Sequence, residues 1–224
     1  MPVKLVVFDM AGTTVIDKNF VARAFQNAFE KEGVAVPIRE INPLMGYEKR
    51  TAIQMLLEKK GIDFDDEMVE DIYNDFIDRM VNFYEYSPEV MPAPGAEELF
   101  HYLRENSVAV ALNTGFPKTI ADAIVNRFRW VERGLVDDYI ASDEVERGRP
   151  YSYMIDRLMY RSGIDDPMLV AKVGDTAVDI EEGKNAGCSY VIAVTTGAYK
   201  GDQLKAIGPT HIVNSLSEIH SVFV

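Results

Sequence analysis

The chain has 224 residues, 47% of them hydrophobic, so it is long enough to bury a sizeable core. Its formal net charge of −13 at pH 7 excludes the basic surface that nucleic acids and anionic membranes require, and so favours a small ligand. Cys188 is the only cysteine, so no internal disulfide can form. No apolar run approaches the roughly 18 residues that span a bilayer, and no basic leader precedes Asp9, so we expect a soluble cytoplasmic protein.

The first predicted strand ends at an aspartate. A short apolar run rich in β-branched residues leads directly into Asp9, and a Gly12-Thr13-Thr14 turn follows. This pattern places Asp9 at the carboxyl end of a buried strand, where open α/β sheets bind ligands. Asp9 can there act as a nucleophile towards phosphorus, while the backbone amides of the turn hold phosphoryl oxygens. Taken alone, the same aspartate is also compatible with a simple turn cap.

Apolar residues then recur at helical spacing, which predicts a helical insertion. Helices are expected over residues 17–33, 48–60 and 65–84, and Gly33 and Gly61 stand where the first two should end. We therefore expect residues 17–88 to form a helical cap that acts as a lid. Residues 1–16 and 89–224 would form the core domain.

Beyond Pro88, Pro92 and Pro94, helix and strand patterns alternate. This alternation predicts an α/β fold, a Rossmann-like, doubly wound parallel sheet into which the cap is inserted. The expected strands are Val108 to Asn113, Asp138 to Ser142, Leu169 to Gly174, Tyr190 to Val194 and His211 to Val213. The expected helices cover residues 95–105, 118–130, 150–163 and 177–186.

A second acidic cluster follows the strand that ends at Gly174. Asp175 comes directly after this strand, and Asp179 lies one helical turn further on. In a parallel sheet all carboxyl ends lie on one edge, so Asp9, Asp175 and Asp179 can converge there. Three carboxylates that converge repel one another unless a cation joins them, and oxygen ligands of this kind suit Mg²⁺.

Two further elements point to the same edge. The strand that ends at Asn113 is followed by Thr114, Gly115 and Phe116, which places a hydroxyl and the amides of a helix N-terminus there. Arg149 precedes Pro150, at which we expect a helix to begin. Its permanent positive charge can offset the carboxylates and hold a phosphoryl oxygen.

These four motifs together resemble those of the haloacid dehalogenase superfamily of hydrolases. The resemblance rests on Asp9 in a DxxGTT context, Thr114, Arg149, and the GDTxxDIxxGxNAG run over residues 174–187, and it spans nearly the whole chain. It implies a Rossmann-like core with a helical cap, a Mg²⁺ cofactor and a phosphoaspartyl intermediate on Asp9. The implied phosphoryl-binding residues are Thr114 and Arg149, and the implied metal ligands are Asp9, the Ala11 backbone carbonyl, Asp175 and Asp179.

Ala11 departs from the pattern of the superfamily's phosphatases, which carry there an aspartate that protonates the leaving oxygen. The loss of a general acid typically lowers the rate by about 10²- to 10⁴-fold, so chemistry that needs no such acid is favoured. The chain resembles instead the phosphonatase branch, which has alanine at this position. In that branch a cap lysine forms a Schiff base with the substrate aldehyde, and Lys49 falls on this position.

Two residues depart from the phosphonoacetaldehyde hydrolases of this branch, which have histidine at the position of Ala52 and tyrosine at that of Phe116. We therefore expect a phosphonatase-like hydrolase that acts on a small phosphonate or phosphorylated substrate, whose identity stays open, as does the choice between monomer and homodimer. Catalytic roles are expected for Asp9, Lys49, Thr114 and Arg149. Substrate contacts are expected from Gly12, Thr13, Met45, Gly46, Gly115 and Phe116.

Three other functions compete with this prediction. A phosphomonoesterase would use the same Asp9 and metal, with Tyr47 or Lys49 as the proton donor. A non-catalytic phosphoacceptor domain would share the sheet and its acidic edge, but it needs neither a lid nor Arg149. A mutase is disfavoured because Ala11 removes its acid/base group.

Overall fold

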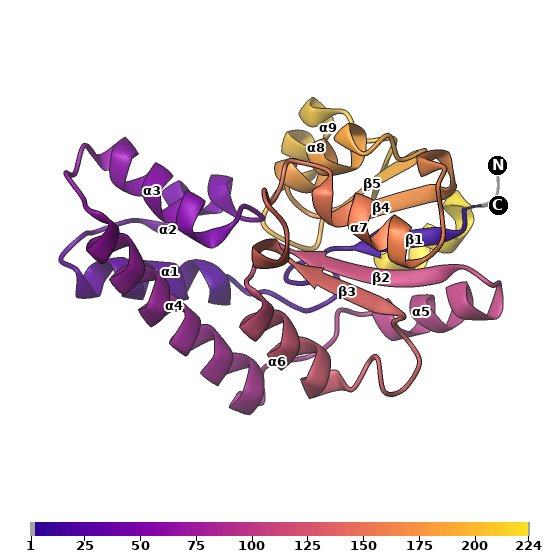
Figure 1. Cartoon of the computed structure of the whole chain (residues 1–224), viewed down its shortest axis with the longest axis horizontal. Coiled ribbons are helices and arrows are strands. Elements are labelled where there is room, and N and C mark those ends of the chain that lie inside the picture. Colours follow the sequence, from indigo (N-terminus) through magenta and orange to yellow (C-terminus); the bar gives the residue numbers. More distant parts are fainter. Residues whose placement is uncertain (1–2, 224) are drawn as a thin grey trace.

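The computed structural model describes residues 3–223 and has a six-stranded, fully parallel sheet at its centre (Figure 1). The strands are β1 (Leu5–Phe8), β2 (Ala109–Thr114), β3 (Asp138–Ala141), β4 (Val170–Gly174), β5 (Tyr190–Val194) and β6 (His211–Val213). Their order is β3-β2-β1-β4-β5-β6, so the chain builds one side of β1 first and then crosses to the other. This confirms the α/β, Rossmann-like fold class.

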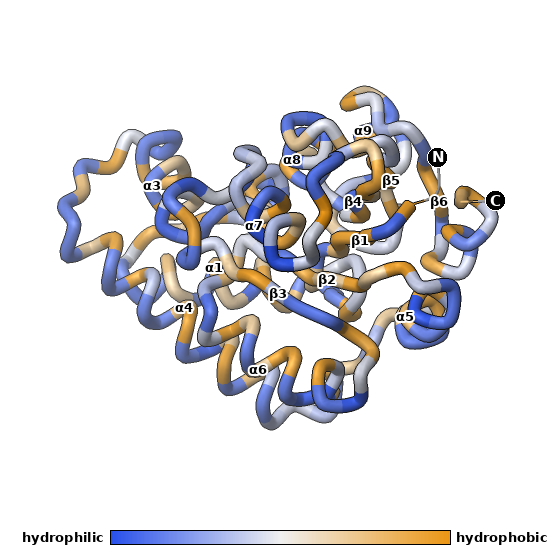
Figure 2. Tube along the Cα trace, turned by 45° about the vertical axis from the view of Figure 1, so that its right-hand side comes forward, coloured by the Kyte–Doolittle hydropathy of each residue, from blue (hydrophilic) through white to orange (hydrophobic). Residues whose placement is uncertain are grey.

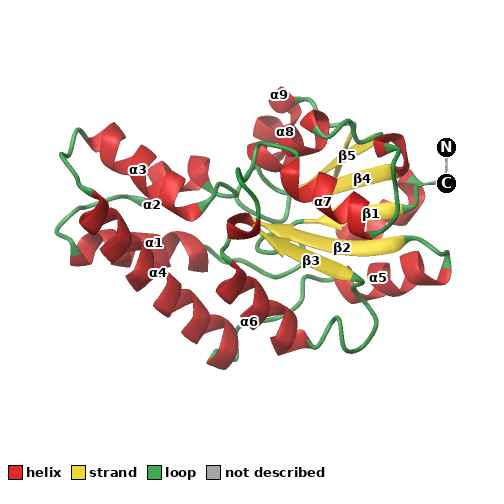
Figure 3. Cartoon of the chain, in the orientation of Figure 1, coloured by secondary structure: helices red, strands yellow, loops and turns green. Residues whose placement is uncertain are grey.

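Helices cover both faces of the sheet (Figure 3). They are α5 (Ala96–Glu105), α6 (Lys118–Phe128), α7 (Tyr153–Arg161), α8 (Ala177–Asn185) and α9 (Gly201–Ile207). Side chains of β1 alternate between the faces: Val6 and Phe8 join the core under α5 and α6, whereas Leu5 and Val7 pack against α7. Figure 2 accordingly shows hydrophobic residues along β1 and β2.

Four helices lie together beyond the carboxyl ends of the strands (Figure 1). They are α1 (Phe20–Lys31), α2 (Ile38–Ile41), α3 (Lys49–Lys60) and α4 (Asp66–Tyr86). Caps fix where two of them begin: the Glu48 carboxylate accepts from backbone N–H groups of α3, and the Asp65 carboxylate from one of α4. The rings of Phe25 and Phe76, from α1 and α4, pack 4.3 Å apart. That residues 17–88 work as a separate, closing lid stays a prediction.

Several boundaries differ from those expected from the sequence. The helix expected to begin at Pro150 begins at Tyr153, because Pro150 lies in a turn in which the Tyr151 N–H bonds to the Gly148 carbonyl oxygen. The sequence pattern predicts neither α2 nor α9, since four and seven residues are too few to show a clear helical period. Within residues 3–223, the helices are too short or too polar to cross a bilayer.

Candidate active site

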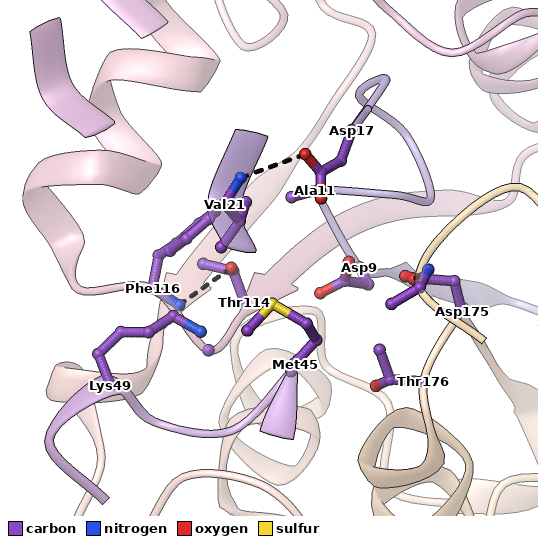
Figure 4. Close-up of a pocket in the computed structure, with 13 residues that line it drawn as sticks. Asp9, Ala11, Asp17, Val21, Met45, Lys49, Thr114, Phe116, Asp175 and Thr176 are labelled. Carbon is purple, nitrogen blue, oxygen red and sulfur yellow. Dashed lines mark hydrogen bonds between the residues drawn. The ribbon is translucent and has the colours of Figure 1, made fainter. Parts of the chain in front are cut away.

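The expected residues meet at the carboxyl edge of the sheet. Strand β1 pairs with β2 on one side and with β4 on the other, and Thr114 closes β2 while Asp9 and Asp175 directly follow β1 and β4. The chain switches direction across the sheet at β1, which is where α/β sheets form their binding crevices. Figure 4 shows Asp9 and Asp175 on one side of this crevice and Lys49, from α3, on the other.

Three buried carboxylates converge as the sequence predicts. Oxygen atoms of Asp9, Asp175 and Asp179 lie within 4.8 Å of one another, and none of the three residues is more than 5% exposed. Burial, and then the nearby charge of Asp179, raises the pKa of Asp9 to about 6. Burial, and then the charges of Asp9 and Asp179, raise the pKa of Asp175 well above its usual value. Burial alone would raise the pKa of Asp179. The positive charges of Arg149 and Lys172 outweigh this effect, so the pKa of Asp179 is lowered.

The Asp175 carboxylate is held in place by two hydrogen bonds and by two glycines whose backbone packs closely against it. The Thr13 hydroxyl donates to Asp175 Oδ1 over 2.9 Å, and the Ala198 N–H donates to Oδ2 over 2.7 Å. Gly12 has a φ of +93°, and a Cβ on it would come within 2.7 Å of Asp175 Oδ2. A Cβ on Gly197 would also collide with this carboxylate. Both glycines are therefore needed for the loops to close around Asp175.

The residues present fit a bound divalent cation. Asp179 Oδ1 is buried and accepts no well-directed hydrogen bond within residues 3–223, although Arg149 and Lys172 nitrogens lie 3.0 Å away. The buried carboxylates Asp9, Asp175, Asp179 and Glu182 exceed the buried cations Arg149 and Lys172 by two charges when Lys49 is neutral and by one charge when it is protonated. One Mg²⁺ would neutralise this excess and replace the protons that the raised pKa values of Asp9 and Asp175 favour.

Arg149 is fully buried and bound on every side by acceptors of the protein. Its Nη1 donates to Asp9 Oδ1 over 2.7 Å and lies 3.0 Å from Asp179 Oδ1. Its Nε donates to Glu182 Oε2 over 2.9 Å, and Nη2 donates to both the backbone and the side-chain oxygen of Asn113. Arg149 therefore holds the Asp9 carboxylate directly, and it does not line the pocket around Asp9.

Lys49 extends from the first turn of α3 into the pocket that contains Asp9 (Figure 4). The residue is 3% exposed, and its Nζ donates to the Tyr47 carbonyl oxygen over 2.9 Å. Nζ lies 5.0 Å from the centre of the Phe116 ring and 5.9 Å from that of Phe25. Burial lowers the pKa of Lys49 to about 8, although the charges of Glu48 and Asp9 act in the opposite direction.

The pocket brings most of the predicted site together. It is lined by Asp9, Ala11, Asp17, Val21, Met45, Gly46, Lys49, Thr114, Gly115, Phe116, Asp175, Thr176 and Ala198. Of the residues expected at the site, Gly12, Thr13, Arg149 and Asp179 do not line it but pack against those that do. Tyr47, the alternative proton donor for a phosphomonoesterase, lines a neighbouring cavity instead.

Sequence reasoning missed several residues here. Asp17 lines the pocket, although the sequence places it only at the start of an expected helix, and its carboxylate accepts from the Phe20 N–H over 2.6 Å. Lys172 and Glu182 are fully buried beside Arg149. A lysine inside the apolar strand Val170–Gly174 was the signal available for this cluster.

Known proteins share both the sequence pattern and the fold. Phosphonoacetaldehyde hydrolases from Bordetella pertussis and Latilactobacillus sakei are 33% and 28% identical, over 92% and 98% of this chain and 78% and 94% of theirs. A hydrolase from Pseudomonas syringae has a TM-score of 0.88 at 16% identity, over 99% of this chain and 98% of its own. A phosphonoacetaldehyde hydrolase-like protein from Oleispira antarctica has a TM-score of 0.85 at 23% identity, over 100% of this chain and 92% of its own.

The two solved structures support the fold of this chain. Its family is shown by a family model. The model for haloacid dehalogenase-like hydrolases matches residues 3–187, which include both acidic clusters, Thr114 and Arg149. A role as a non-catalytic phosphoacceptor domain is thereby set aside. The chain belongs to the haloacid dehalogenase-like hydrolases and is an enzyme.

Proposed function

We propose that this enzyme is a Mg²⁺-dependent, phosphonatase-like hydrolase that cleaves the carbon–phosphorus bond of a small phosphonate carrying an aldehyde. Phosphonoacetaldehyde, the substrate in the names of relatives up to 33% identical, is the first candidate. One observation carries the proposal. A buried amine, Lys49, lines the same pocket as Asp9, and Ala11 occupies the place of the general acid.

The reaction begins with the amine. The neutral Lys49 Nζ adds to the aldehyde carbon and, with one proton taken up from solvent, water leaves, so that a C=N⁺ bond replaces the C=O bond. Asp9 then attacks phosphorus, the carbon–phosphorus bond breaks, and its electron pair moves towards the iminium nitrogen to give an enamine. Because the electrons move into this π-system, no leaving oxygen needs a proton, which accounts for Ala11.

Two hydrolytic steps complete the cycle. Protonation of the enamine carbon and attack of water on the iminium release the aldehyde product and return the Lys49 amine. A second water cleaves the aspartyl phosphate, which releases inorganic phosphate and regenerates Asp9.

The remaining residues orient the Asp9 carboxylate and stabilise the phosphoryl group. The Thr114 hydroxyl oxygen accepts from the Phe116 N–H over 3.1 Å, which leaves the hydroxyl proton for a phosphoryl oxygen. Arg149 holds Asp9 in position for attack. Carboxylates of the acidic cluster and the Ala11 carbonyl would hold Mg²⁺, whose positive charge would offset the negative charge of the phosphoryl oxygens.

A substrate panel with chemical trapping tests this proposal. Phosphonoacetaldehyde and a set of alkyl phosphate esters are compared with Mg²⁺ present, and phosphate release is measured. Borohydride with an aldehyde substrate should inactivate the enzyme and add mass at Lys49. Lys49→Arg should abolish both the release of phosphate from phosphonoacetaldehyde and the inactivation by borohydride, although it keeps the positive charge. Lys59→Arg, at an exposed position of the same helix, should change neither the phosphate release nor the inactivation. Turnover of phosphate esters alone, retained in Lys49→Arg, would identify a phosphomonoesterase instead.

A further inference from the structure

A second buried cation lies beside Arg149. Lys172 sits in the middle of β4, between Ala171 and Val173, and its side chain is 0% exposed. The steps proposed above do not use it. A charged lysine is almost never fully buried in a protein unless acceptors surround it, so its contacts define what it does.

Lys172 and Arg149 share three acceptor atoms. Lys172 Nζ lies 2.5 Å from Asn113 Oδ1, 3.0 Å from Asp179 Oδ1 and 3.1 Å from Glu182 Oε2. Nitrogens of Arg149 lie 2.5, 3.0 and 2.9 Å from the same three oxygens. The two cations are therefore joined through a common set of acceptors that come from β2 and α8.

The backbone is shaped to allow this arrangement. Lys172 is level with Val7 on the neighbouring strand β1, two residues before Asp9. Helix α8 reaches Lys172 closely because Gly183 faces it, and a Cβ on Gly183 would come within 2.9 Å of Lys172 Cβ. This close approach brings Glu182, next to Gly183, within reach of Lys172 Nζ.

We propose that Lys172 is a positioning residue of the active site, which fixes the acceptors of Arg149 and thereby aims the Asp9 carboxylate. The inference rests on the proposed role of Asp9 as the nucleophile. Without Lys172, these three oxygens are free to shift, and the Arg149 guanidinium shifts with them. Because Arg149 Nη1 holds Asp9 Oδ1 at 2.7 Å, such a shift moves the attacking carboxylate out of line.

A double-mutant cycle between Lys172 and Arg149 tests the inference. Lys172→Met, Arg149→Met and the double variant are compared with the wild type for kcat, KM, the unfolding midpoint and the Kd for inorganic orthovanadate in MgCl₂. Lys205→Met, on an exposed turn of α9, is the matched control. Should Lys172→Met fail to fold, Lys172→Met/Glu182→Gln removes one buried charge of each sign, so that the buried net charge stays as in the wild type, and it is compared with Glu182→Gln alone.

Lys172→Met should lower kcat and weaken vanadate binding by about 10- to 100-fold, the usual effect of removing a residue that orients catalytic groups, with KM changed less than about 3-fold. In the Arg149→Met background the same substitution should add less than about 2-fold, since the effect passes through Arg149. Equal, additive losses in both backgrounds, or a lower unfolding midpoint with unchanged kcat, would overturn the inference. Vanadate binding tests the role of Lys172 even if the enzyme does not turn over phosphonoacetaldehyde. Absence of that turnover would count against the proposed function but not against the role of Lys172.

Discussion

The pH dependence of the Lys49 amine tests the proposed chemistry most directly. Only the neutral amine attacks an aldehyde, and burial lowers the pKa of Lys49 from 10.5 to about 8. At pH 7 a pKa of about 8 leaves about one amine in ten neutral, whereas the ordinary value leaves about one in 3,000. The folded pocket therefore increases the neutral fraction of Lys49 about 300-fold.

Phosphate release from phosphonoacetaldehyde, measured as kcat/KM with Mg²⁺ fixed, should rise about tenfold from pH 7 to 9.5, with its midpoint near pH 8 and a plateau above about pH 9. Starting at pH 7 keeps Asp9, whose pKa is raised to about 6 by burial, largely ionised. The rate of borohydride trapping with an uncharged aldehyde should follow the same curve, which separates Lys49 from ionisation of the substrate. A flat profile, or a rise centred near 10.5, would refute the reasoning.

Three further substitutions have defined outcomes. Ala11→Asp restores a carboxyl where the phosphatases have their acid, so hydrolysis of an alkyl phosphate should rise by up to about 10²-fold, while p-nitrophenyl phosphate, whose leaving group needs no acid, should change little. Thr13→Val removes the donor 2.9 Å from Asp175 Oδ1, so calorimetry should show Mg²⁺ binding weakened about 10-fold, and an unchanged affinity would contradict that role. Gly115→Ala adds a methyl group that collides with carbonyl oxygens of the loop before α3, so kcat/KM should fall at least about 10-fold. Gly201→Ala, with its nearest neighbour 3.8 Å away, should leave the activity unchanged, and equal effects of the two glycine substitutions would contradict the close contact.

The sheet and its acidic edge could be predicted because each strand is a short, mainly apolar run that a polar residue ends or directly follows. Parallel pairing then brings Asp9, Thr114 and Asp175 to one edge without further information. Asp179 follows from helical spacing alone, and its oxygen does reach the other carboxylates. These residues could be found because local periodicity determines where their side chains point.

The Lys172 cluster could not be predicted in the same way. Its members Asn113, Lys172 and Glu182 come from β2, β4 and α8, and no local pattern indicates that they meet. Their contact depends on the strand order and on how closely Gly183 lets α8 approach β4. A buried lysine in an apolar strand indicates that acceptors must surround it, but only the fold determines which ones.

Phe116 and Ala52 stand where the phosphonoacetaldehyde hydrolases have tyrosine and histidine, and these two differences are compatible with a reactive amine at Lys49. An aromatic face 5.0 Å from Lys49 Nζ favours the ammonium form, whereas burial favours the neutral amine. The buried environment prevails, since the pKa falls to about 8, and the Tyr47 carbonyl still accepts a hydrogen bond from either form of the amine. The proposed role of Lys49 as a nucleophile therefore needs no polar side chain at positions 52 and 116, because burial lowers the pKa of the amine without a neighbouring base.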